Sequence, residues 1–154
     1  MSQWIGFTNQ KLYQCRLLLA QREQASDASL VKALEESALY QLHDAWRSYL
    51  QELADMVSLR DTVTSLPDLL QRAPLVTGEM NELRQLAGNS FSWLAQMLSA
   101  VSAQQQPGVS RPRAAAEAAT LISIADDSSA TPVKGWLQDL TRLIEGQREN
   151  RQES

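Results

Sequence analysis

Eight apolar residues between positions 29 and 57 follow one another at spacings of three or four, and no other feature of the chain constrains its fold as strongly. They are Val31, Leu34, Ala38, Leu42, Ala45, Tyr49, Leu53 and Met56. An α-helix has 3.6 residues per turn, so this spacing puts all eight on one side of a helix. The pattern predicts a helix over residues 29–59 whose apolar face packs against other helices.

Three further segments show helical periodicity, over residues 2–24, 77–104 and 132–147. The third of these long helices is interpreted as continuous and kinked at Gly88, because its apolar residues stay in phase on both sides of that glycine. A break into two helices is the alternative, since glycine followed by Asn-Ser can end one helix and start the next. Ser65 followed by Pro67 predicts a short additional helix.

These elements predict an all-α fold, a single-domain antiparallel helical bundle of four long helices with one or two short extra helices. The chain has 154 residues, which is the size of one domain. We expect the bundle domain to span residues 1–149, with residues 150–154 forming a frayed C-terminal tail. The alanine-rich residues 112–119 have high helix propensity, and residues 121–124 suit either a helix end or an extended strap laid on the bundle.

The composition argues against the metal sites and catalytic motifs that can be recognised in a sequence, because the chain contains one histidine and one cysteine. A zinc site needs several such ligands, and the six glycines are scattered singly rather than gathered in a phosphate-binding loop. His43 lies at the margin of the apolar stripe, and Cys15 lies on the apolar face of residues 2–24. We therefore predict no catalytic residues, no cofactor-binding residues, no metal site and no cofactor.

Charge and hydropathy predict a soluble, cytoplasmic protein. The formal net charge is −4 with both signs mixed along the chain, whereas nucleic-acid binders gather Lys and Arg on one face. The N-terminus lacks the basic and apolar regions of a signal peptide. The uncharged stretch between Arg84 and Arg111 carries too many Gln, Ser and Asn residues to span a bilayer. No nucleic acid and no membrane are expected as partners.

One polar cluster is singled out as a candidate site. Asn9, Tyr13 and Arg16 share a face of the first helix, and Glu35 falls on the core stripe of the second. In an antiparallel hairpin Glu35 would lie roughly level with Leu18, so Arg16 and Glu35 could meet. Two interpretations follow, a buried ion pair that fixes the helix register, or a small pocket for an anionic ligand or partner.

A candidate interface lies on the third long helix, which carries no charge after Arg84. Depletion of charge is typical of the centre of protein–protein interfaces. The polar face opposite its apolar stripe consists of Gln85, Asn89, Ser92, Gln96 and Ser99. The alternative is that the connection over residues 112–129 covers this face within the same chain.

Three short runs resemble a family of short bacterial, pseudomonad-type helical proteins of unknown function. The runs are NQKLYQCRLLL at residues 9–19, ELRQL at 82–86 and SWL at 92–94. The resemblance would cover most of the chain, and its motifs are helical packing patterns. It implies an all-α cytosolic protein and brings no activity with it.

The sequence thus predicts a non-enzymatic helical interaction or accessory protein whose partner is another protein or a second copy of the chain. The alternative is a degenerate relative of the helical bundles that process nucleotides or RNA. Such a relative would retain binding of an anionic ligand through Arg16.

Overall fold

The computed structural model describes residues 2–107 and 131–153, and within these two ranges the regular structure is all α-helical. The helices are α1 (Gln3–Gln24), α2 (Ala28–Met56), α3 (Leu66–Arg72), α4 (Gly78–Gly88), α5 (Trp93–Gln104) and α7 (Pro132–Glu153). The all-α prediction is therefore confirmed for this part of the chain. None of these helices is long and apolar enough to cross a bilayer. Residues 112–129, with the helix end or strap expected at 121–124, lie outside the described residues.

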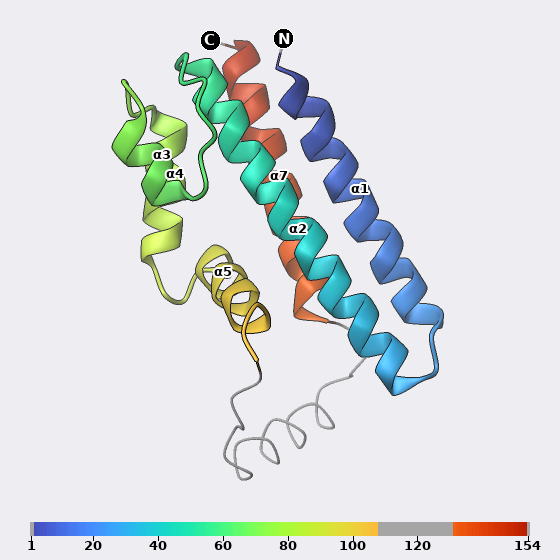
Figure 1. The fold of residues 1–154 in the computed structure, drawn as a ribbon. Helices are drawn as coiled ribbons and strands as arrows, with labels where there is room; N and C mark the ends of the chain where they lie inside the picture. The colour runs from blue at the N-terminus through green and yellow to red at the C-terminus, as the bar shows by residue number, and fades with distance from the viewer. Residues whose placement is uncertain (1, 108–130, 154) are drawn as a thin grey trace.

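Three long helices, α1, α2 and α7, lie side by side (Figure 1). Ala25–Asp27 turn α1 back into the antiparallel α2, whose N-cap Asp27 accepts a hydrogen bond from the backbone N–H of Ser29. The first turns of α7 meet the end of α1 through Lys134 and Glu23, and its last turns meet the end of α2. Helix α7 therefore runs parallel to α2 and antiparallel to α1.

The shorter helices α3, α4 and α5 lie beside α2 and α7, on the side away from α1 (Figure 1). Helix α4 meets the C-terminal half of α7, where the Gln147 amide donates to the carbonyl of Glu79. Helix α5 reaches the N-terminal half of α2, where the Gln104 amide donates to the carbonyl of Glu36. The core between these layers takes buried side chains from every described helix, including Leu12, Leu42, Leu69, Leu83, Met97 and Leu140.

The long stripe on α2 is buried as the sequence predicts, but only over its central part. Its members from Ala38 to Leu53 are at most 1% exposed, whereas Met56 is 47% exposed. Val31 and Leu34, at the start of the helix, are half-buried. The core therefore sits around the middle and C-terminal turns of α2.

The interpretation of residues 77–104 as one kinked helix is wrong, because the structure contains two helices there, α4 and α5. The side chain of Ser92 caps α5 by accepting from the backbone N–H of Ala95. The same hydroxyl donates to the carbonyl of Leu86 near the end of α4, and the Asn89 side chain accepts from the N–H of Phe91. Local side-chain hydrogen bonds thus compete with the helix and interrupt it. Where the sequence predicts four long helices, the structure therefore has three long helices, α1, α2 and α7, and the two shorter helices α4 and α5.

Helix α2 ends at Met56 rather than at the predicted residue 59. Ser58 takes a left-handed backbone conformation with φ of 62°. The backbone N–H of Leu59 then donates to the carbonyl of Ala54, and the backbone N–H of Ser58 donates to the carbonyl of Asp55. This pair of bonds is the Schellman motif, which usually has glycine at the left-handed position.

Replacing Ser58 by Gly is expected to raise the free energy of unfolding by about 0.5–1 kcal/mol. Glycine adopts the left-handed conformation without the Cβ penalty, and this gain exceeds the extra entropy that it loses on folding. The urea midpoint followed by circular dichroism measures the change. Ser58→Ala is the control, because it keeps the Cβ and should give no gain. Equal midpoints for the two variants would contradict the prediction.

Helix α7 extends beyond residue 147, where the sequence predicts its end. Thr131 and Pro132 start α7 as expected, with the Thr131 hydroxyl accepting from the N–H of Lys134. The helix then continues past residue 147 to Glu153. Gln147 is 2% exposed, and Arg148 and Arg151 are held in ion pairs. These tertiary contacts order a segment whose composition is polar and charged.

Candidate functional site

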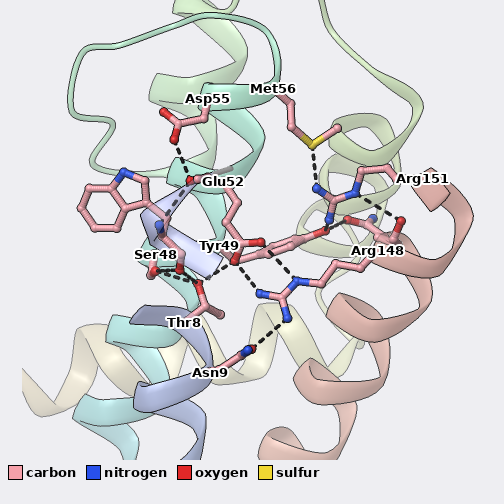
Figure 2. Close-up of polar contacts among 12 residues, drawn as sticks. Thr8, Asn9, Ser48, Tyr49, Glu52, Asp55, Met56, Arg148 and Arg151 are labelled. Atoms are coloured by element: carbon pink, nitrogen blue, oxygen red, sulfur yellow. Dashed lines mark hydrogen bonds and ion pairs between the residues drawn. The ribbon is translucent and has the colours of Figure 1, made fainter. Parts of the chain in front are cut away.

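A buried carboxylate, Glu52 of α2, lies at the end of the molecule where α1, α2 and α7 meet (Figure 2). Glu52 is 1% exposed, and the guanidinium of Arg148 binds both of its oxygens. Nη2 of Arg148 lies 2.8 Å from Oε2, and Nε lies 3.2 Å from Oε1. Such two-point pairing is the strong geometry for an arginine and a carboxylate. The charge on Glu52 is therefore compensated inside the protein.

Two hydroxyl groups complete the surroundings of this carboxylate. Thr8 Oγ1 lies 2.6 Å from Glu52 Oε2 and 2.6 Å from Ser48 Oγ, and both hydroxyls are near the carbonyl of Trp4. Each hydroxyl has a single proton. The assignment that satisfies the carboxylate has Thr8 donating to Glu52 and Ser48 donating to Thr8 or Trp4. We call Thr8, Asn9, Ser48, Glu52 and Arg148 the Glu52 network, because Asn9 Oδ1 also accepts from Arg148 at 2.8 Å.

A second group of polar side chains adjoins this network on the α4 side (Figure 2). The Tyr49 hydroxyl donates to the Gln147 side-chain oxygen, and Arg151 lies 3.1 Å from Glu79 Oε2. Burial raises the pKa of Tyr49 above its ordinary value, although the nearby Arg151 opposes the shift. Burial also raises the pKa of Glu79, with Arg151 opposing and the carboxylate of Glu82 reinforcing that rise. Tyr49 thus stays protonated at neutral pH.

The chemistry that these groups can perform is limited by their pairing. The Glu52 oxygens accept from Arg148 and Thr8, and the side chain has almost no exposed surface for a substrate. Among residues 2–107 and 131–153, no three His, Cys, Asp or Glu side chains gather in a way that would hold a metal ion. The Glu52 network joins the ends of three helices, which supports a structural role.

A surface groove of about 520 Å³ runs between α1 and α7. Helix α1 contributes Arg16, Leu19, Ala20 and Glu23 to its lining, and α7 contributes Lys134, Leu137, Gln138, Thr141 and Arg142. We call this site the α1–α7 groove. Leu19 and Leu137 are 7% and 6% exposed and form an apolar floor. Basic side chains outnumber acidic ones in the lining, in a chain whose net charge is −4.

The charges of the α1–α7 groove are distributed unevenly. Lys134 pairs with Glu23 at 3.3 Å, which neutralises one end. Arg16 and Arg142 are exposed and form no ion pair with any described residue. The register set by Lys134 with Glu23 and by Arg148 with Asn9 places Arg16 level with Thr141 and Arg142. Two guanidinium groups therefore flank the same end of the groove.

The structure does not bring the predicted polar cluster together. Glu35 pairs with Arg22 at 2.8 Å instead of Arg16, because the α1–α2 register lies about one turn away from the expected one, which put Glu35 level with Leu18. The same register pairs Lys11 with Asp44 and Ser2 with Asp55. Asn9 binds Arg148, and Tyr13 is 55% exposed. Arg16 alone of the cluster lines the α1–α7 groove.

The predicted interface residues are divided between two helices and their connection. Gln85 belongs to α4, while Gln96 and Ser99 belong to α5, and all three are exposed. Asn89 and Ser92 cap the helices at the break, so their presence has a local structural explanation. Burial of this face in an association remains a prediction, and the covering segment over residues 112–129 lies outside the described residues.

The single cysteine and the single histidine both lie partly or wholly inside the fold. Cys15 is 0% exposed, and burial raises the pKa of its thiol to about 12 despite the nearby Arg16. His43 is half-buried, and burial lowers its pKa, with Arg47 acting in the same direction and Asp44 opposing. The imidazole is therefore neutral at pH 7.

Cys15 is expected to resist thiol reagents in the folded protein. Raising the thiol pKa from 9.0 to about 12 lowers the thiolate fraction about a thousandfold at pH 8, and burial also blocks access. Maleimide labelling at pH 8 followed by mass spectrometry measures the rate, with the chain in denaturant giving the full rate. A Ser37→Cys variant, at an exposed position of α2, is the matched control and should label rapidly. Similar rates at the two folded sites would contradict the prediction.

Sequence reasoning missed Glu52 and Arg148 for different reasons. Glu52 follows Tyr49 by three positions, so it falls on the core stripe, and a charge there signals a buried partner. Arg148 lies just beyond the end of the helix predicted over residues 132–147. Lys134 and Arg142 were also missed, although their spacing of eight residues puts them on one face of the last helix.

Comparison with known proteins gives a family but no activity. No significant match was found among curated proteins or among solved structures. The expectation of a family of unknown function is confirmed, while a bacterial, pseudomonad-type origin stays a prediction. A family model matches residues 1–154, and the chain belongs to that family, the family of unknown function DUF6586.

Proposed function

We propose that this protein is a non-enzymatic interaction protein that binds an acidic segment of a partner protein in the α1–α7 groove. The observation that supports the proposal is the exposed arginine pair, Arg16 and Arg142, which no described acidic side chain neutralises. Arginine is suited to this role because its planar guanidinium binds carboxylates at two points. We expect the protein to act in the cytoplasm.

The state of the reactive side chains supports a non-enzymatic role. A catalytic acid, base or nucleophile must reach the substrate and have a pKa matched to its task. The Cys15 thiol is buried with its pKa raised to about 12, and the Glu52 carboxylate is enclosed by Arg148 and Thr8. These groups serve packing and helix pairing, which leaves the surface groove for recognition.

A second candidate is binding of a small anionic ligand, as in a degenerate nucleotide- or RNA-processing bundle. The same pair, Arg16 and Arg142, favours it, because two guanidinium groups at one end of a cavity suit a phosphate group. A ligand that binds only the native state stabilises it by RT ln(1 + [L]/Kd), so the melting temperature rises as the ligand concentration exceeds Kd. A thermal-shift panel of nucleotides and inorganic phosphate therefore tests this candidate directly.

The main proposal is tested by comparing two charge-reversal variants in an affinity pull-down. The groove variant carries Arg16→Glu and Arg142→Glu. The matched control carries Arg60→Glu and Arg84→Glu, which reverse the same number of exposed arginines outside the groove. Both variants should keep the circular dichroism spectrum of the wild type.

We expect the wild type and the control variant to capture a common set of proteins from the lysate of the encoding organism. The groove variant should fail to capture these proteins. The lost proteins should carry acidic segments. Identical captured sets for the groove variant and the control would overturn the proposal. A thermal shift with nucleotides that the groove variant abolishes would instead favour the second candidate.

A further inference from the structure

We infer that the α1–α7 groove accepts an acidic amphipathic α-helix, contributed by the partner protein. The inference rests on the proposed function and specifies the structural element that this groove recognises. Three features of the described residues support it, namely the shape of the groove, the apolar residues on its rim and the position of its charges.

The shape of the α1–α7 groove suits a helix. Its α1 lining follows the spacing i, i+3, i+4 and i+7 from Arg16 to Glu23, and the α7 lining repeats that spacing from Lys134 to Thr141. Residues with this spacing form a straight wall of about 10 Å at 1.5 Å per residue. Two antiparallel helices with such walls leave a channel that a third helix can fill by packing its side chains into theirs.

An exposed apolar side chain, Tyr13, extends the apolar surface of the groove along α1. Tyr13 is 55% exposed and Leu17 is 47% exposed, although both are large enough to gain from burial. On the helical wheel Tyr13 lies on the same side of α1 as the lining residue Ala20, whereas Leu17 lies nearly opposite the floor residue Leu19. A docked helix would cover Tyr13 together with the exposed parts of Leu19 and Leu137. A lone phosphate or carboxylate would leave this apolar surface in water.

The charges set where the acidic residues of the docked helix should lie. Arg16 and Arg142 flank one end of the groove, and the paired Glu23 and Lys134 flank the other. A helix with Glu or Asp in one terminal turn and an apolar stripe along its length complements both features. This is the helix-in-groove mode of recognition, in which a few apolar anchors at i, i+3, i+4 and i+7 carry the contact.

The inference is tested with synthetic peptides and the full-length, isotope-labelled protein. The probe is a capped peptide of about 15 residues, the length at which a designed helix becomes stable in water. It has an apolar stripe at i, i+3, i+4 and i+7 and glutamates in one terminal turn. One control peptide replaces the glutamates by glutamine, and another has a central proline that breaks the helix. Nuclear magnetic resonance titration locates the binding surface.

We expect the acidic helical probe to shift the amide signals of residues 16–23 and 134–142. Both control peptides should bind at least about tenfold more weakly, which is about 1.4 kcal/mol. The groove variant should lose binding to the same extent, and the Arg60→Glu, Arg84→Glu control should not.

Several outcomes would overturn the inference. Absence of binding at millimolar concentration, equal binding of the glutamine or proline peptide, or signal shifts outside the groove would each do so. Competition by inorganic phosphate at equimolar concentration would show that the site recognises a small anion. Concentration-dependent dimers that the groove variant abolishes would show that a second copy occupies it. If the pull-down difference holds and the helical probe fails, the proposed function stands without this inference.

Discussion

Replacing Glu52 by Gln is expected to lower the free energy of unfolding by about 3–5 kcal/mol. The substitution keeps the size of the side chain but removes the charge that compensates Arg148, whose side chain is only 19% exposed. It also turns one acceptor facing the guanidinium and Thr8 into an amide donor. Breaking a buried pair is costly because the remaining charge keeps its desolvation penalty without its partner. Urea unfolding followed by circular dichroism measures the change.

A matched control is the Glu35→Gln variant, which removes a carboxylate from an ion pair with Arg22 at the same 2.8 Å. The Glu35 carboxylate is 32% exposed, whereas that of Glu52 is 1% exposed, so water weakens the Glu35 pair and its loss should cost less, about 0–1 kcal/mol. In a double-mutant cycle, Glu52→Gln with Arg148→Met should cost clearly less than the two single changes added together. Additive effects would mean that the two side chains are not coupled.

The parts of the fold that the sequence predicts well are those fixed by local periodicity. The α2 stripe is predicted from residues a few positions apart, and its central members from Ala38 to Leu53 are buried. Caps are readable for the same reason, because Thr131 before Pro132 and Ser65 before Pro67 act within one turn. The information needed for these predictions lies in neighbouring residues.

The errors arise where two local signals compete. Apolar residues stay in phase across Gly88, and this periodicity favours one continuous helix. Ser92 and Asn89 instead satisfy the free backbone groups at the break, and the chain forms α4 and α5. At the end of α2, Ser58 takes a conformation typical of glycine, so its residue type gives no warning of the helix end.

The candidate site was less predictable, because it depends on contacts between distant residues. Helical periodicity places Arg16 on a face of α1 but does not fix the register against α2, so the partner of Glu35 was predicted wrongly. The lining of the α1–α7 groove joins Arg16 to Arg142, and the Glu52 network joins α2 to the last turns of α7. Neither pairing follows from spacing along one helix.

Removing residues 147–154 is expected to have the largest effect of any change considered, although the composition of this segment suggests a dispensable tail. The truncation takes Arg148 from Glu52, Gln147 from Tyr49 and Arg151 from Glu79. The buried carboxylate of Glu52 then loses its positively charged partner, and the buried Tyr49 hydroxyl loses its acceptor. The decrease in the free energy of unfolding should exceed that caused by Glu52→Gln. It should approach the total stability of an ordinary domain, about 5–15 kcal/mol.

A smaller deletion, which leaves a chain ending at Arg151, separates the effect of the tail's contacts on stability from the effect of its length. It removes residues 152–154 and keeps Gln147, Arg148 and Arg151, so its stability should stay within about 0.5 kcal/mol of the full chain. Circular dichroism and urea unfolding compare the two truncations. A chain ending at Gly146 that unfolds at the same urea concentration as the full chain would mean that the Glu52 network does not hold α7 in place. A large loss of stability in the chain ending at Gly146, but not in the chain ending at Arg151, would show that the last two turns of α7 are part of the folded core.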